Sequence, residues 1–128
     1  MLKVFLLEDS DLIRDRMLPQ LEQIHGVEVI GCATHLSQAR QLLLALKPDM
    51  LVLDLQLPDG NALQAVNGLR ALAPQAEMAV FTNHVGPAIL AKCAQAGLRW
   101  VFDKSGEFEL LWGLVQRLSA EQHAGASA

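Results

Sequence analysis

Short apolar runs alternate along this chain with longer segments in which apolar residues recur every three or four positions. A run of about four to eight apolar residues is typical of a buried β-strand, whereas the longer spacing is typical of an amphipathic helix. The runs predict five strands, at residues 2–8, 27–33, 50–54, 77–82 and 100–103. The segments between them predict five helices, at about 11–24, 36–46, 63–72, 87–97 and 106–118. This alternation predicts an α/β fold, with a parallel sheet covered by helices on both faces.

Residues with strong conformational preferences support these boundaries. Ser10 or Asp11 is placed to cap the first helix, and Pro19 within that helix should kink it or alter a turn. Pro87 is a favourable first residue for the fourth helix. Residues 57–60, with the sequence Leu-Pro-Asp-Gly, predict a tight turn after the third strand.

Composition limits the functions open to the chain. Its 128 residues suit one domain, and 52% hydrophobic against 19% charged residues argues against disorder. The net charge is −4 and the basic residues form no cluster, so we expect no direct binding of nucleic acid. The first strand begins at once and no apolar run approaches the length of a membrane span. We therefore expect no signal peptide, no membrane association and a cytoplasmic location.

The two cysteines are Cys32 and Cys93, and both are predicted to be buried thiols of a reducing cytoplasm. A disulfide is the less favoured interpretation, because Cys32 falls in a predicted strand and Cys93 in a distant helix. Cys32 and His35 do not form a zinc site, since no second ligand pair follows at suitable spacing.

Polar side chains stand where four of the predicted strands end. Glu8 and Asp9 follow the first strand, Asp54 the third, Thr82 the fourth and Lys104 the fifth. Ligands of open α/β sheets bind outside the carboxyl ends of the strands, where the strand order reverses. We therefore expect these five side chains to line a single pocket.

Three carboxylates in one pocket would repel one another strongly without a cation. Glu8, Asp9 and Asp54 bring −3, Lys104 supplies +1, and one divalent cation would bring the sum to zero. An all-oxygen site with room for water suits Mg²⁺, or Mn²⁺, rather than zinc. An aspartate beside a metal, a lysine and a hydroxyl is a candidate nucleophile toward phosphorus.

Each pocket residue also has an ordinary structural interpretation. A strand-end aspartate such as Asp9 or Asp11 often caps a helix, a strand-end threonine often belongs to a turn, and Lys104 alone would be a solvated loop residue. Coincidence at four strand ends is harder to explain in this way, so the functional interpretation is favoured.

The same residues carry a resemblance to a known family. The motifs that resemble bacterial response-regulator receiver domains are Leu7-Glu8-Asp9-Ser10, residues 48–60, Thr82, and Ala96-Gly97 through Asp103-Lys104-Ser105. The resemblance covers residues 2 to about 118. It implies a flavodoxin-like fold, a doubly wound five-stranded parallel sheet in order 2-1-3-4-5 with five helices. Residues 1–118 would be the receiver domain, and residues 119–128 a flexible tail or the start of a linker.

The resemblance also implies a role for each pocket residue. Asp54 would accept a phosphoryl group from a histidine kinase or histidine phosphotransfer protein. Lys104 would bind a phosphoryl oxygen, and Thr82 would move toward it as the switch. Mg²⁺ would be held by oxygen ligands: Asp9, Asp54, the backbone carbonyl of Gln56, and Glu8 acting through water.

Val101 departs from the usual pattern of the family, in which an aromatic residue often stands three residues before the pocket lysine. Strand periodicity points its neighbours Trp100 and Phe102 to the opposite face of the sheet. Without a large ring swing, the signal is expected to travel by a backbone shift of residues 82–87 and the helix that follows. The face formed by that helix, the fifth strand and the fifth helix would dock a partner or form a homodimer.

Four other positions add detail. Ser105 stands where a proline often follows the lysine, and Pro19 has no functional interpretation. His84 and Gln56 occupy positions that influence hydrolysis of the phospho-aspartate in the family, although both could be solvated loop residues. The other histidines are expected at the surface.

Several classes of protein are alternative interpretations of this pocket. A phosphoacceptor receiver of a two-component system, a Mg²⁺-dependent switch with no enzyme activity beyond its own phosphorylation and hydrolysis, agrees with every pocket residue. An aspartyl-nucleophile, metal-dependent phosphatase would have a second acid where Gln56 stands, and a cap domain. A phosphorylation-independent pseudo-receiver scaffold would not need all five polar residues. A nucleotide-binding module would need a glycine-rich loop after a strand.

Overall fold

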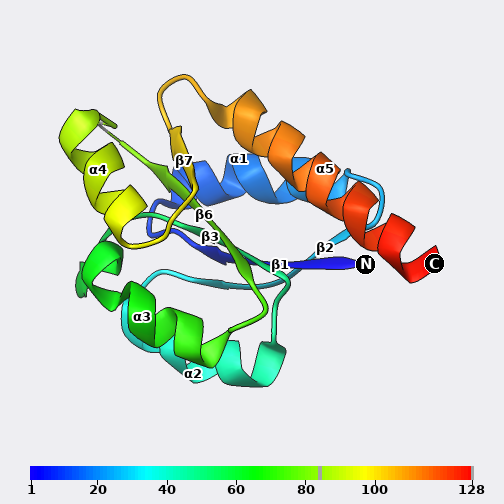
Figure 1. Cartoon of the computed structure of the whole chain (residues 1–128), viewed down its shortest axis with the longest axis horizontal. Helices are drawn as coiled ribbons and strands as arrows, with labels where there is room; N and C mark the ends of the chain where they lie inside the picture. The colour runs from blue at the N-terminus through cyan, green and yellow to red at the C-terminus, as the bar shows by residue number, and fades with distance from the viewer. Residues whose placement is uncertain (84, 128) are drawn as a thin grey trace.

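Parallel strands form the sheet at the centre of the molecule, in the order β2-β1-β3-β6-β7 (Figure 1). This is the predicted order 2-1-3-4-5 of the main strands. The computed structural model describes residues 1–83 and 85–127, so the expectations for His84 and for Ala128 lie outside the described residues. The strands are β1 (Leu2–Leu7), β2 (Val27–Ala33), β3 (Met50–Leu53), β6 (Glu77–Thr82) and β7 (Trp100–Asp103).

Helices cover both faces of this sheet, as predicted. Figure 1 shows α1 and α5 on one face and α2 and α3 on the other. The helices are α1 (Asp11–Glu22), α2 (Leu36–Leu46), α3 (Ala62–Leu72), α4 (Pro87–Gln95) and α5 (Phe108–Ser127). None of them, in the part of the chain that the structure describes, has the length and apolar character that a membrane crossing requires.

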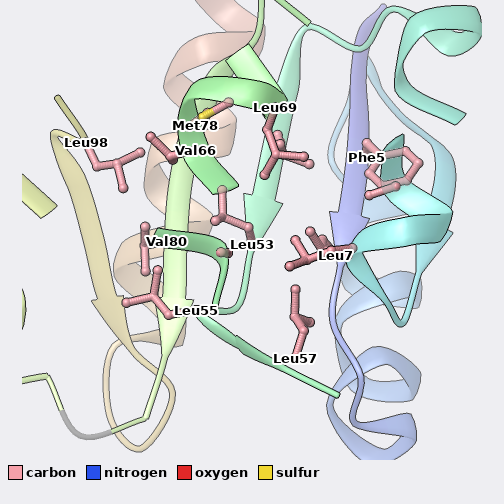
Figure 2. Packing of buried hydrophobic residues seen from close by; sticks show 14 of the residues in the cluster. Phe5, Leu7, Leu53, Leu55, Leu57, Val66, Leu69, Met78, Val80 and Leu98 are labelled. Atoms are coloured by element: carbon pink, nitrogen blue, oxygen red, sulfur yellow. The ribbon is translucent and has the colours of Figure 1, made fainter. Parts of the chain in front are cut away.

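Alternating side chains of the strands build two separate cores. Phe5 and Leu7 of β1 pack into the core beneath α2 and α3, which Figure 2 shows, whereas Val4 and Leu6 belong to the core beneath α1 and α5. Side chains of a strand point to opposite faces in turn, which explains the division. Strand β3 is buried along its whole length, as predicted for a central strand. Its carboxyl end is therefore fixed from both sides.

A small hairpin follows β3 where the sequence predicts only a turn. Strand β4 (Gln56–Leu57) pairs antiparallel with β5 (Gly60–Asn61). Gly60 has a φ of 151°, a value that residues with side chains rarely adopt. The predicted turn at residues 57–60 is thus confirmed, and it connects two strands.

The starts of α1 and α4 agree with the sequence prediction. The Ser10 side chain caps α1 by accepting a hydrogen bond from the Ile13 N–H at 3.3 Å, so Ser10 rather than Asp11 is the cap. The helix then runs without a break through Pro19 to Glu22. Pro87 is the first residue of α4, as predicted.

Helix α5 continues to Ser127, well beyond the end predicted near Leu118. The buried Ser119 hydroxyl donates to the His25 carbonyl at 3.1 Å. The exposed rings of His25 and His123 stack, with centroids 6.2 Å apart. The first turn after Leu118 therefore packs against the domain.

The prediction that both cysteines are buried is wrong for Cys32. Cys93 is buried, whereas Cys32 is exposed, and both are free thiols. Strand β2 is at the edge of the sheet, and among the described residues its one pairing partner is β1. An edge strand is covered less completely than a central one, so its side chains keep contact with solvent.

Candidate functional site

The five predicted pocket residues meet at the carboxyl edge of the sheet. Asp9, Asp54, Thr82 and Lys104 line a pocket of about 780 Å³, and Glu8 lies beside them with only 1% of its surface exposed. Glu8 directly follows β1 and Asp54 directly follows β3, while Thr82 is the last residue of β6. Parallel strands end at the same edge, which is why residues so distant in sequence come together.

Asp54 is the centre of the hydrogen-bond arrangement. Its Oδ1 accepts from the Thr82 hydroxyl at 2.9 Å and from the Gln56 N–H at 3.2 Å, and its Oδ2 accepts from Lys104 Nζ at 2.7 Å. The side chain is almost fully buried. The Asp54 N–H donates to the Leu7 carbonyl at 3.0 Å, which fixes the backbone at this point to the sheet.

Lys104 also pairs with a second buried acid. Its Nζ is 2.6 Å from Glu8 Oε1, and Glu8 Oε2 accepts from the Ser10 N–H at 3.0 Å. Burial raises the pKa of Glu8, although the hydrogen bonds from Lys104 and Ser10 act in the opposite direction. Burial would lower the pKa of Lys104, but its bonds to Asp54 and Glu8 outweigh that effect and leave the pKa raised.

Three acids of the pocket are close enough to share one cation. A carboxylate oxygen from each of Glu8, Asp9 and Asp54 lies within 4.8 Å of the others, and Asp9 is exposed at the mouth. Three acids and Lys104 leave a formal charge of −2. An all-oxygen donor set with this charge fits a hard divalent cation such as Mg²⁺.

Comparison with known proteins decides the family. Residues 4–116 match the family described as response regulator receiver domain. The chain belongs to this family. Receiver domains are typically signalling modules of two-component systems rather than enzymes.

Curated relatives extend beyond the region that this receiver matches. The response regulator GacA of Pseudomonas aeruginosa is 27% identical over 122 residues, which are 95% of this chain and 57% of GacA. The DNA-binding transcriptional activator DevR/DosR of Mycobacterium tuberculosis is 29% identical over 97 residues, which are 76% of this chain and 45% of that protein. The chain thus spans about half the length of these relatives.

Solved structures share the receiver fold. A LuxR-family two-component response regulator from Aurantimonas has a TM-score of 0.82 at 26% identity, covering 93% of this chain and 85% of the other. The isolated REC domain of RcsB from Salmonella enterica serovar Typhimurium has a TM-score of 0.76 at 23% identity, covering 82% and 78%. At 23% identity, the similarity to the RcsB domain is evidence of a shared fold and of nothing more.

The structure confirms that Val101 faces away from its aromatic neighbours. Val101 packs against the core beneath α2 and α3, whereas Trp100 and Phe102 pack against the core beneath α1 and α5. After the pocket lysine of this receiver, the Ser105 N–H and hydroxyl donate to Asp103 Oδ1 at 2.8 Å and 2.6 Å. These bonds close the turn that begins at Lys104.

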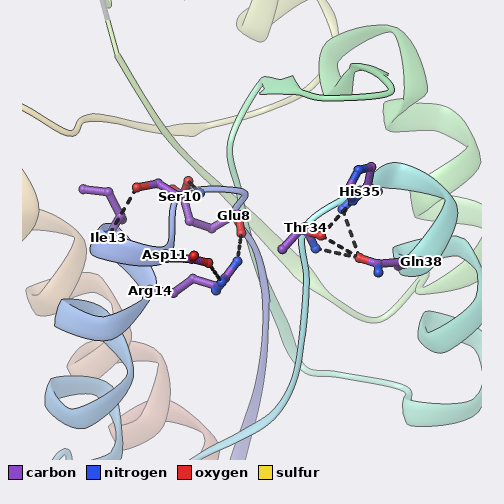
Figure 3. A network of polar contacts seen from close by, with 8 residues as sticks. All are labelled: Glu8, Ser10, Asp11, Ile13, Arg14, Thr34, His35 and Gln38. Atoms are coloured by element: carbon purple, nitrogen blue, oxygen red, sulfur yellow. Dashed lines mark hydrogen bonds and ion pairs between the residues drawn. The ribbon is translucent and has the colours of Figure 1, made fainter.

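Arg14 and Asp11 hold the turn between β1 and α1, next to Glu8 and Asp9. Arg14 donates to the Glu8 carbonyl at 3.0 Å and forms an ion pair with Asp11, as Figure 3 shows. Asp11 therefore pairs with Arg14 while Ser10 caps the helix. This arrangement fixes the backbone that carries Glu8 and Asp9.

Sequence reasoning gives Asp59 no role beyond a turn residue, although its side chain connects the pocket loop to a helix. Its Oδ1 accepts from the Leu36 N–H at 2.8 Å and its Oδ2 from the Ser37 N–H at 3.0 Å. These bonds lower the pKa of Asp59, the one to Leu36 most. No local pattern could have shown this contact, because its partners are more than twenty residues away in the sequence.

Proposed function

We propose that this receiver is a phosphoacceptor switch in which Asp54 takes a phosphoryl group from a histidine kinase or a histidine phosphotransfer protein. The observation that carries the proposal is the set of donors around Asp54: the Lys104 ammonium, the Thr82 hydroxyl and the Gln56 N–H. Preorganised donors of this kind stabilise the charge that develops on a transferring phosphoryl group.

The transfer is a substitution at phosphorus. An Asp54 carboxylate oxygen forms a bond to phosphorus while the bond from phosphorus to the donor imidazole nitrogen breaks. The nitrogen keeps the electron pair and takes up a proton. Lys104, whose Nζ lies 2.7 Å from Asp54 Oδ2, would then bind a phosphoryl oxygen. Later attack of water on the mixed anhydride releases phosphate and restores the carboxylate.

One Mg²⁺ would be held by the acidic mouth of the pocket. Its ligands would be Asp9, Asp54 and the backbone carbonyl of Gln56, with Glu8 acting through water. Both oxygens of Glu8 already accept hydrogen bonds, one from Lys104 and one from Ser10, which favours the indirect role. When bound, the ion would neutralise charge on the acids and on the phosphoryl oxygens.

Thr82 would transmit the phosphorylation of Asp54 to the surface of the domain. Its hydroxyl already donates to Asp54 at 2.9 Å, so only a short movement would bring it to a phosphoryl oxygen. The movement would shift the backbone that leads into α4 and alter the face made by α4, β7 and α5. A partner or a second copy would dock there.

The whole protein would act in the cytoplasm as a signalling module. Residues 1–118 would form the receiver and residues 119–128 the start of a linker, helical up to Ser127. A net charge of −4 gives no basis for DNA binding by this chain itself.

Phosphorylation of one side chain tests this proposal. The purified chain is incubated with acetyl phosphate and Mg²⁺, and intact mass spectrometry counts the phosphoryl groups. The wild type should gain one group and Asp54→Asn none, because the amide is not a nucleophile for this reaction. Asp15→Asn, which makes the same change at an exposed site on α1, should behave as the wild type. Full phosphorylation of Asp54→Asn would contradict the assignment.

A further inference from the structure

Helix α2 takes part of its N-terminal cap from a distant loop. The first two N–H groups of the helix, from Leu36 and Ser37, donate to the two carboxylate oxygens of Asp59 at 2.8 Å and 3.0 Å. The first N–H groups of a helix have no partner within the helix, and an anion is favoured at that end. Asp59 therefore ties the hairpin turn to the start of α2.

A second group caps α2 independently of the hairpin. Gln38 Oε1 accepts from the Thr34 N–H at 2.9 Å, the Thr34 hydroxyl at 2.9 Å and the His35 N–H at 3.2 Å (Figure 3). These bonds stay within the segment that enters the helix. The helix start can therefore be weakened either with or without disturbing the hairpin.

The hairpin turn also packs against α2. A Cβ atom at Gly60 would lie 3.0 Å from Cδ1 of Leu36, so the backbone of the turn approaches that side chain closely. Leu57 is buried in the core beneath α2 and α3. The hairpin is thus fixed to the helix by packing and, through Asp59, by two hydrogen bonds.

The pairing pattern of the hairpin sets the direction of the Gln56 carbonyl. Leu57 pairs with Gly60 and Gln56 with Asn61, and the Ala62 N–H donates to the Leu55 carbonyl at 2.7 Å. Opposed residues of antiparallel strands alternate between hydrogen-bonded and non-bonded pairs, so both backbone groups of Gln56 point away from β5. Its N–H donates to Asp54 at 3.2 Å, which places its carbonyl on the pocket side as well.

We propose that Asp59 is a positioning residue for the metal site, because it anchors the hairpin that presents the Gln56 carbonyl to the acidic pocket. The inference rests on the proposed function, in which that carbonyl is a ligand of Mg²⁺. Asp59 itself does not touch the metal. It acts through Leu36 and Ser37, whose N–H groups keep the turn in place. Losing this anchor leaves the charge of the three pocket acids unchanged but frees the Gln56 carbonyl to move.

Metal titration of matched variants tests the inference. Mn²⁺ replaces Mg²⁺ as the probe, and electron paramagnetic resonance measures the free ion in solutions of the full chain. Asp59→Ala should weaken Mn²⁺ binding about tenfold, a typical loss when a group that orients a ligand is removed. Asp59→Asn, which keeps one acceptor oxygen, should recover part of the affinity.

Gln38→Ala is the matched control, because it removes the other cap of α2 and leaves Asp59 in place. It should lower the melting temperature yet bind Mn²⁺ as the wild type does. Wild-type affinity in Asp59→Ala, or an equal loss in Gln38→Ala, would overturn the positioning role. Asp9→Ala tests the proposed site itself. If the wild type and Asp9→Ala bind Mn²⁺ alike, the proposed metal site fails, whatever Asp59 does.

Discussion

Lys104 forms ion pairs with two carboxylates at once. Its Nζ is 2.6 Å from Glu8 and 2.7 Å from Asp54, and all three side chains are buried. A phosphoryl group on Asp54 would carry more negative charge than the carboxylate and would draw the lysine toward it. Glu8 would then lose part of its pairing. The lysine therefore links the state of Asp54 to the electrostatic environment of Glu8.

The raised pKa of Glu8 predicts a specific pH dependence. A carboxyl group whose pKa is higher in the folded than in the unfolded state stabilises the fold most when it is protonated. Its contribution should be full below the usual pKa of 4.5 and lost as the pH rises through the raised pKa of the folded state. Glu8→Gln cannot ionise, so the variant should gain stability relative to the wild type as the pH rises from about 4 to 7.

Urea unfolding of the metal-free protein across that pH range measures the difference. Glu109→Gln is the control, since Glu109 is exposed on α5 and the substitution is the same. If the stability of Glu8→Gln falls with pH as steeply as that of the wild type, burial does not raise the pKa of Glu8 in the way the structure indicates.

The sequence predicts the pocket residues that follow strand ends. It does not predict residues that act through contacts with parts of the chain far away in the sequence. Glu8, Asp54 and Thr82 follow from locating where apolar runs stop, because parallel strands end at one edge. From the sequence, Asp59 is predicted only to be a turn residue, because its hydrogen bonds to α2 join segments far apart in the sequence. The exposure of Cys32 depends on β2 being an edge strand, which the residues of β2 alone do not indicate.

At the scale of elements, α5 shows how a tertiary contact extends a helix. The residues after Leu118 are small and polar, so they carry no apolar stripe from which a packed helix could be predicted. The buried Ser119 hydroxyl bonds to the His25 carbonyl, and the His123 ring stacks on His25. The short β4–β5 hairpin was missed for a related reason. Two residues per strand are too few for any periodic pattern.

Ser119→Ala tests whether the extension of α5 belongs to the fold. The substitution removes the donor to the His25 carbonyl and should lower the free energy of unfolding by about 1 kcal/mol. Chemical denaturation measures this loss. Glu121→Ala, which breaks an exposed ion pair with Arg117, should cost less than about 0.5 kcal/mol. Equal, negligible effects of the two substitutions would mean that this contact does not stabilise the domain.

At the scale of the whole molecule, the pocket lies between two cores that share one sheet. Asp54 follows β3, whose residues alternate between the core beneath α2 and α3 and the core beneath α1 and α5. Thr82 ends β6, which pairs with β3 on one side and β7 on the other. In the proposed switch, a change at Asp54 would act through Thr82 on the backbone that leads from β6 into α4, while Lys104, which follows β7, contacts Asp54 directly.

Hydrogen exchange measured with and without beryllofluoride, an acyl-phosphate mimic, tests this route. We expect protection to change most in the segment from Thr82 through α4, because a packed Val101 leaves no large ring to carry the signal. Asp54→Asn, which cannot form the adduct, should show no change. Changes confined to α1, or to the pocket alone, would contradict transmission through α4.

The cap that Asp59 provides to α2 also bears on the order in which the chain folds. Its two hydrogen bonds span 23 and 22 residues, so the helix precedes its own cap in the sequence. During synthesis from the N-terminus, the residues of α2 leave the ribosome before Asp59 does. Until β3 and the hairpin have formed, the first turn of α2 lacks these two partners and should fray. The start of this helix is therefore expected to become native late, together with the loop that holds the pocket.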